Sequence, residues 1–253
     1  MNGWCREGSE HTWKSRRNIC RAGFVMIAMS DAAIVTAVDR PVASKWVTWL
    51  GLCVSLFSMI IIRQAFRAIT PEPDTTLALA REACMFASAG LLLWLVRRKE
   101  RLPLRSIGIG TAPVWKSLAW GLVIAVACVA PAALIAKITG YGHGAASQAF
   151  ARLPLWLVFI VVVRAGVVEE LFYRGYSIER LQGLGFGRIP SWLVPLVIFG
   201  ASHWTGGAAN IVMALMLGAI LTAFYELRRD LVSNMFGHFL VDFVANVLPA
   251  MFA

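Results

Sequence analysis

Six ionisable side chains lie in three late, strongly apolar stretches of the chain, and their types and spacing could support chemistry. They are Glu169, Glu170, Arg174, His203, His238 and Asp242. An ionisable group at the middle of a bilayer costs about 2.5 to 3.5 kcal/mol on insertion scales. A cluster of such groups therefore indicates mutual pairing, a function, or both.

The first group closes the apolar run that begins at Leu155. On a helix, Glu170 and Arg174 are four residues apart and can pair, whereas Glu169 points about 100° away. One carboxylate can thus be neutralised while the other meets a different neighbour. An unpaired carboxylate in a low-dielectric site suits a general base that takes a proton from water. The alternative interpretation is a solvated salt bridge where the helix reaches the interface.

The histidines come from two later runs. A single histidine near a helix end, such as His203, also fits a hydrogen-bonded structural residue at the membrane interface. His238 and Asp242 are four residues apart on one face and lie well inside an apolar run. They are therefore either an imidazole held by its carboxylate or two groups that converge on one substrate or ion.

The elements that must position these residues are membrane helices. Of the 253 residues, 58% are apolar and 15% are charged, which indicates a polytopic membrane protein with an all-α transmembrane bundle. Seven spans are expected, with an eighth candidate at 24–38 that also fits an interfacial or cytoplasmic helix. The seven are 46–62, 76–96, 114–136, 154–180, 190–204, 208–226 and 231–252.

The basic residues gather beside the spans, so the net charge of +10 indicates membrane topology and no nucleic-acid partner. The densest basic cluster, at 97–105, predicts a cytoplasmic loop and hence a cytoplasmic N-terminus. Arg63 and Arg67 depart from this pattern because they fall on the outer side. We expect a basic segment at 1–45, cytoplasmic or interfacial, followed by a transmembrane domain at 46–253 in a bacterial inner membrane.

Three motifs follow one another on the late helices: Glu-Glu-x-x-x-Arg, Phe-x-x-x-His and His-x-x-x-Asp. In this combination the chain resembles the CAAX prenyl endopeptidase and bacteriocin-processing (CPBP, or Abi) family of intramembrane proteases. The resemblance covers about 100–250, including a basic stretch that ends at Gly110. It implies an endopeptidase that acts on a membrane-associated peptide or protein within the lipid bilayer.

The resemblance also implies roles for the motif residues. Glu169 is the general base and His203 its partner in activating a water. His238 and Asp242 stabilise the oxyanion, and Glu170 and Arg174 support the site. The prenyl endopeptidases carry asparagine where this chain has Asp242, and an aspartate donates a hydrogen bond only when it is protonated. Asp242 can instead orient His238 or ligate a metal.

Zinc is the alternative to a metal-free mechanism, with Glu169, His203 and His238 as the ligands. We expect no cofactor, because the helix-borne motif His-Glu-x-x-His is absent from the sequence. A serine protease built on Ser202 and His238 would leave the carboxylates without a purpose. A transporter, scaffold or immunity factor that retains the fold remains a non-enzymatic alternative. Arg164 is a candidate partner for a carboxylate, and Arg81 with Glu82 are expected at a solvated or paired helix end.

Overall fold

The computed structural model describes residues 44–70, 74–139 and 153–251 of the chain. The candidate helix at 24–38 and almost all of the basic segment at 1–45 lie outside these residues. The division into a basic segment and a transmembrane domain therefore stays a prediction.

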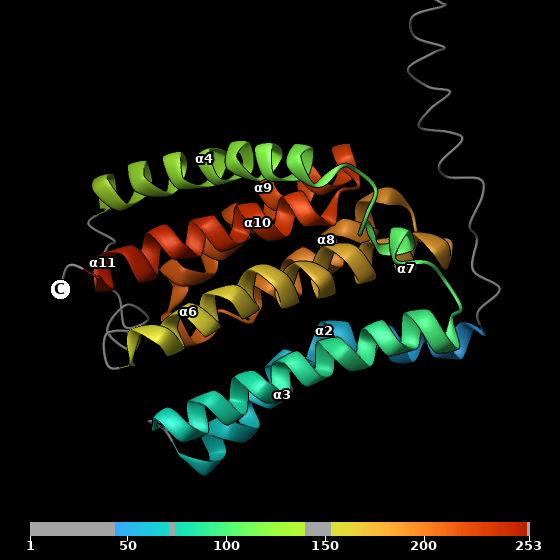
Figure 1. Ribbon diagram of the computed structural model, residues 1–253, viewed down its shortest axis with the longest axis horizontal. Helices are drawn as coiled ribbons and strands as arrows, with labels where there is room; N and C mark the ends of the chain where they lie inside the picture. The colour runs from blue at the N-terminus through green and yellow to red at the C-terminus, as the bar shows by residue number, and fades with distance from the viewer. Residues whose placement is uncertain (1–43, 71–73, 140–152, 252–253) are drawn as a thin grey trace, which may run out of the picture. The chain divides into compact units, whose positions relative to one another are not determined.

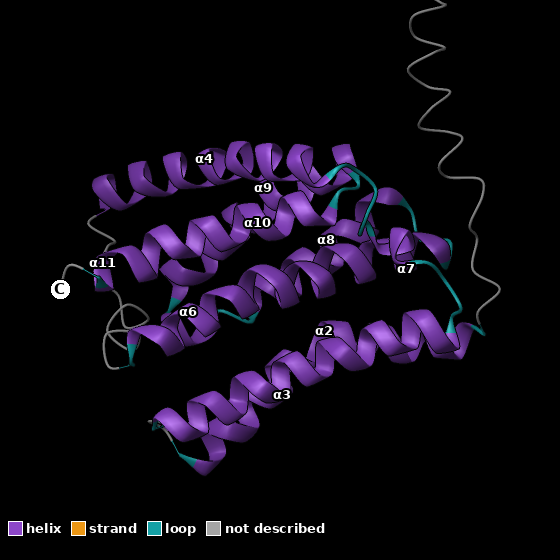
Figure 2. Cartoon of the chain, viewed as in Figure 1, coloured by secondary structure: helices purple, strands orange, loops and turns teal. Residues whose placement is uncertain are grey.

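The described residues form helices and loops, without a strand (Figure 2). The expected all-α fold is confirmed. The longer elements are α2 (Lys45–Ile69), α3 (Thr75–Trp94), α4 (Val114–Thr139), α6 (Leu155–Arg164), α7 (Ser177–Gly183), α8 (Arg188–Ala201), α9 (Ala208–Arg228) and α10 (Leu231–Asp242). The short ones are η1 (Leu95–Lys99), η2 (Leu104–Ile107), η3 (Ala165–Glu169), η4 (Leu171–Tyr176), η5 (Trp204–Gly206), η6 (Phe243–Val247) and α11 (Leu248–Ala250).

The protein is an integral membrane protein with a polytopic helical bundle. Among the described residues, five helical stretches are long and apolar enough to span a bilayer: Lys45–Ile69, Thr75–Lys99, Val114–Lys137, Ala208–Arg228 and Leu231–Ala250. The other two expected spans, 154–180 and 190–204, are not among these long apolar stretches. The run from α6 to α7 carries several charged residues, and α8 has only 14 residues. His203 consequently lies in the turn after α8 and not within a helix.

The helices pack in two layers (Figure 1). One layer contains, in order, α4, α10, α6 and α3, and the other contains α9, α8 and α2 behind them. The main apolar core lies between α2, α3, the run from α6 to α7, α8 and α9. The α6 to α7 run is therefore central, with α10 on one side and the α2–α3 pair on the other.

The central run contains two successive π-helical turns, η3 and η4. A π turn is uncommon and often marks a functional site, because it inserts a residue and changes which way the following side chains point. Gly166 in η3 allows α10 to approach closely. A Cβ added there would lie 2.8 Å from the carbonyl oxygen of Met235 and 2.9 Å from the backbone nitrogen of Phe239.

A tight turn fixes the start of α10. Arg229 adopts a left-handed conformation with φ of 50°, and its amide donates to the carbonyl of Tyr225 at 2.7 Å. The Asp230 carboxylate then caps α10 by accepting from the amide of Ser233. Arg229 also pairs with Glu179 in α7 at 2.6 Å. The register of α10 against the central run is thus set from this end.

The close approach at Gly166 predicts a stability effect. Gly166→Ala forces a methyl group against the backbone of α10, so we expect a loss of about 1 to 3 kcal/mol, as for other overpacked sites. Gly90→Ala is the matched control, since an added Cβ at Gly90 meets nothing within 4 Å. It should be neutral or slightly stabilising, because alanine favours helix more than glycine does. Thermal unfolding in detergent measures both. Equal melting temperatures for the two variants would contradict the packing argument.

Candidate functional site

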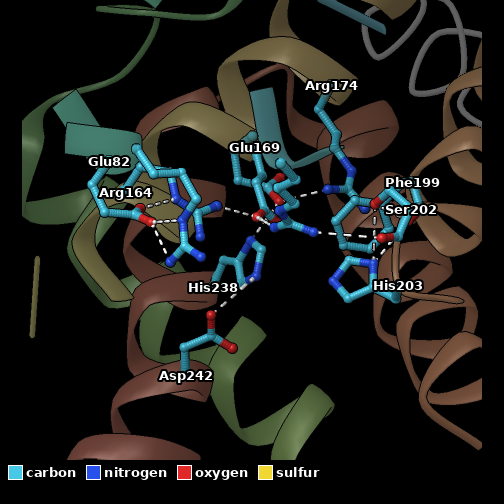
Figure 3. Close-up of polar contacts among 12 residues, drawn as sticks. Glu82, Arg164, Glu169, Arg174, Phe199, Ser202, His203, His238 and Asp242 are labelled. Atoms are coloured by element: carbon cyan, nitrogen blue, oxygen red, sulfur yellow. Dashed lines mark hydrogen bonds and ion pairs between the residues drawn. The ribbon is translucent and has the colours of Figure 1, made fainter. Parts of the chain in front are cut away.

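All six ionisable residues of the three motifs lie in one region of the bundle (Figure 3). The Phe199 ring contacts three of them, Arg174, His203 and His238. Its centroid lies 4.8 Å from the His203 ring and 6.3 Å from the His238 ring, with edge-to-face geometry in both cases. The Arg174 guanidinium lies over the same ring at 4.5 Å. Segments far apart in sequence, η4, the end of α8, and α10, therefore meet around one aromatic side chain.

Glu170 is fully buried and has three partners. Its Oε1 accepts from Nη1 of Arg174 at 2.6 Å and lies 2.8 Å from Nδ1 of His238. Its Oε2 accepts from the side-chain amide of Asn234 at 3.1 Å. The predicted pair of Glu170 with Arg174 is present. Because the carboxylate is fully engaged, Glu170 can orient its neighbours but has little capacity left to take a proton.

Glu169 faces other neighbours, as the helical spacing predicts, but it is not an unpaired carboxylate. Its Oε1 accepts from Nη1 of Arg164 in a short contact and from Nη2 of Arg63 at 3.3 Å. Of the two possibilities, an unpaired carboxylate and one partnered by Arg164, the structure has the second, because an unpaired charge in an apolar bundle is strongly unfavourable. Both guanidinium groups bind the same oxygen. The other oxygen, Oε2, accepts no hydrogen bond from any described residue.

Arg164 is held from its far side by α3. Its Nε donates to Oε2 of Glu82 at 2.8 Å, and Arg81 pairs with Oε1 of Glu82 at 2.9 Å. Glu82 is only 1% exposed. The expected pairing of Arg81 with Glu82 is therefore present, but inside the bundle and not at a solvated helix end. Glu82 is therefore connected to the site by its ion pair with Arg164.

Arg63, on α2, is a site residue that the sequence motifs do not reveal. Its two terminal nitrogens donate to Glu169 and, at 3.5 Å, to the carbonyl of Ser202. It therefore links the general-base candidate to the turn that carries His203. The available signal was its place in the charge pattern, where Arg63 and Arg67 depart from the positive-inside rule. Arg67 lies over the Trp204 ring at 5.5 Å.

His203 is held by its own turn. Its Nδ1 lies 2.8 Å from the carbonyl oxygen of Phe199 and 3.3 Å from the Ser202 hydroxyl. A carbonyl only accepts, so Nδ1 carries the proton in the neutral ring and Nε2 is left as an acceptor. The side-chain amide of Asn210 donates to the His203 carbonyl at 3.1 Å and fixes the turn. His203 and Glu169, both among the described residues, form no direct hydrogen bond with each other.

His238 lies between two carboxylates. Its Nδ1 faces Glu170, and its Nε2 lies 3.8 Å from Oδ2 of Asp242, which is too long for a hydrogen bond. The Asp242 side chain is 27% exposed. Asn234, the third member of this face at four-residue spacing, binds Glu170 and was missed by the motif search. The stripe Asn234, His238, Asp242 along α10 was the signal for it.

Metal-ligating geometry is not found in the part of the chain that the structure describes. No three His, Cys, Asp or Glu side chains there lie close enough together to hold a metal ion. In the ligand set considered for zinc, Glu169 faces two guanidinium groups, and Nδ1 of both His203 and His238 faces a protein oxygen. The expectation of a metal-free site stays a prediction.

Comparison with known proteins adds the family. Residues 151–244 match the family described as Rce1-like, type II CAAX prenyl endopeptidase Rce1-like. This segment contains all three motifs. None of the curated proteins or solved structures matches the chain. The family match supports a protease of the CAAX type that acts on a membrane-associated protein. Residues 151–244 are thus similar to the type II CAAX prenyl endopeptidase family, in agreement with the resemblance that the three motifs indicate.

Proposed function

We propose that the protein is an intramembrane endopeptidase in which Glu169 activates a water for attack on a peptide carbonyl. The observation that carries this proposal is the state of the Glu169 carboxylate. Two guanidinium groups hold one oxygen and leave the other without a partner, beside two imidazoles. A carboxylate that acts as a base must be fixed in place and still have a free lone pair for the proton.

The reaction begins with a water hydrogen-bonded to Oε2 of Glu169. As the water oxygen attacks the carbonyl carbon, its proton passes to Oε2 and the carbonyl oxygen becomes an oxyanion. Collapse of this intermediate breaks the C–N bond, and Glu169 returns the proton to the leaving amine. The same carboxyl group therefore serves first as the general base and then as the general acid.

His203 positions the water in this mechanism. Its Nδ1–H is used by the Phe199 carbonyl, so Nε2 can accept the second hydrogen of the water. The turn that carries His203 is fixed by Asn210 and by the contact of Arg63 with Ser202. The water would thus be held from two sides, by Oε2 of Glu169 and by Nε2 of His203.

His238 stabilises the oxyanion. The carboxylates of Glu170 and Asp242 flank its ring, and the proposed role uses the doubly protonated imidazolium. In that form Nδ1–H donates to Glu170, and Nε2–H is available to the developing negative charge. Asp242, at 3.8 Å, acts here through its charge and the orientation of the ring. Asp242 does not donate a hydrogen bond to the oxyanion in this mechanism, because an ionised carboxylate has no proton to donate.

The substrate follows from the site only as a class, a protein or peptide associated with the membrane. Prenylated C-termini, leader peptides of the bacteriocin type and membrane-anchored sorting signals are all compatible with a lipid-embedded site. An assay therefore uses purified protein in liposomes with one quenched fluorescent peptide of each type. The peptide that is cleaved then serves in all comparisons.

The first prediction concerns the base and its partner. Glu169→Gln keeps the size and an acceptor oxygen for the guanidinium groups but cannot take a proton, so we expect kcat to fall by about 10²- to 10⁴-fold. His203→Ala should also lower kcat strongly. Glu226→Gln is the matched control, because Glu226 pairs with Arg188 and Arg229 at the far end of α9 and contacts no motif residue.

Folded protein is measured by size-exclusion chromatography and thermal unfolding, so that loss of activity is not confused with loss of fold. This check matters for Glu169→Gln because the change disturbs a buried ion pair. His203→Ala removes no ion pair and provides the second, independent variant. Retained cleavage in either folded variant would contradict the assigned roles. A scaffold or transporter would show no cleavage even for the unaltered protein.

The second prediction concerns metal. We expect cleavage to persist at an unchanged rate after treatment with 1,10-phenanthroline, because the base and the oxyanion donor are protein groups that face arginines and carboxylates. Addition of zinc should not raise the rate. Inhibition by the chelator that zinc reverses would select the metal-dependent mechanism instead.

A further inference from the structure

We propose that Arg63 of α2 is a catalytic residue that donates to the oxyanion opposite His238. This inference rests on the proposed function and assigns a role to a residue outside the segment that matches the family, 151–244. The charge, the contacts and the exposure of Arg63 each point to an anionic partner that forms during the reaction.

The charge of the surrounding cluster is unbalanced. Arg63, Arg81 and Arg164 are three cations, and Glu82 and Glu169 are the two anions that they contact. Arg164 is saturated by a carboxylate on each side. The excess positive charge therefore resides on the outer members of the row, and of these only Arg63 contacts Glu169. A buried or half-buried excess charge is unfavourable unless an anion approaches it.

The contacts of Arg63 are weak and leave donors unused. Its bond to Glu169, at 3.3 Å, reaches an oxygen that Arg164 already occupies, and its bond to the Ser202 carbonyl is 3.5 Å long. A guanidinium has five N–H groups, so at least three remain for another acceptor. Charge-assisted hydrogen bonds in a tight pair are about 2.7 to 2.9 Å long. Arg63 is thus held in place without being saturated.

Arg63 is also accessible, which separates it from Arg164. Its side chain is 27% exposed, whereas that of Arg164 is 5% exposed. A substrate carbonyl attacked by a water on Oε2 of Glu169 must lie within a few ångströms of that carboxylate. Arg63 is the accessible cation in direct contact with Glu169 among the described residues. It can therefore reach the carbonyl oxygen as that oxygen becomes negative.

A second donor is needed because Asp242 does not provide one when it is ionised. An oxyanion held by His238 alone would face the Asp242 carboxylate without compensation. With Arg63, the oxyanion lies between a guanidinium and an imidazolium. Arg63 donates hydrogen bonds without transferring a proton. The water proton still passes to Glu169, and the electron pair of the carbonyl bond moves to oxygen and back as the C–N bond breaks.

The test compares Arg63→Gln with Arg63→Lys in the liposome assay. Loss of an oxyanion donor typically lowers kcat by about 10²- to 10³-fold, so we expect this for Arg63→Gln with KM little changed. Arg63→Lys keeps the charge and should recover part of kcat. Arg67→Gln is the matched control. Arg67 lies one turn later on α2, contacts the Trp204 ring, and should retain full activity.

The fold should survive Arg63→Gln, because the remaining pairs of Arg81 with Glu82 and Arg164 with Glu169 are balanced in charge. Thermal unfolding checks this. A second measurement uses a peptide with a tetrahedral phosphinate in place of the scissile amide. Its affinity should fall in Arg63→Gln by about the same factor as kcat, because the interaction is made mainly with the transition state.

Three outcomes would overturn the inference. Unchanged kcat and phosphinate affinity in Arg63→Gln would remove Arg63 from the reaction. Equal loss in Arg63→Gln and Arg67→Gln would indicate a general effect of charge on α2. A loss confined to KM, and seen for a peptide with a free C-terminal carboxylate but not for its carboxamide, would show that Arg63 binds the substrate terminus instead. If the unaltered protein cleaves and Glu169→Gln does not, the proposed function stands in all three cases.

Discussion

Burial of ionised groups in an apolar bundle is the constraint on which the site depends. An unpaired charge at this depth is strongly unfavourable, so each buried carboxylate must meet a cation from another part of the chain. Glu82 on α3 meets Arg164 on α6, and Arg164 meets Glu169 in η3. Glu170 meets Arg174 and His238 in the same way. These pairs fix the relative positions of α3, the central run and α10, because any helix shift would break an ion pair inside the membrane.

The same ion pairs give the two adjacent carboxylates different roles. Glu170 has both oxygens engaged and acts as a rigid support for His238, whereas Glu169 has one oxygen held and one free. A π-helical turn on each side of Glu170 changes the direction of the neighbouring side chains and helps to separate the two environments. In the proposed mechanism this preorganisation means that no charge must be desolvated or reoriented when the water is deprotonated.

Local spacing made part of the site predictable from the sequence. The Glu170–Arg174 pair and the His238–Asp242 face both follow from four-residue spacing on one helix, and hydrophobicity alone indicated the all-α membrane bundle. Arg164, five residues before Glu169, was a candidate partner from the sequence, but the contacts that reach this pair from α2 and α3 could not be found this way. Arg63 is 106 residues from Glu169, and Glu82 is 82 residues from Arg164. Periodicity within a helix carries no information about such contacts, and only the unusual position of Arg63 in the charge pattern hinted at one.

The acidic residue at 242 is consistent with an oxyanion site once the whole charge arrangement is considered. A carboxylate that cannot donate would weaken the site if its task were to bind the oxyanion directly. In the proposed mechanism it instead lies beside the His238 ring, 3.8 Å from Nε2, and orients that ring. In this mechanism a cationic donor attracts the oxyanion more strongly than a neutral amide would, and Arg63 contacts Glu169 directly. In this proposal two cations, Arg63 and His238, take the place of the amide, which makes α2 as necessary to the proposed chemistry as the helices that carry the motifs.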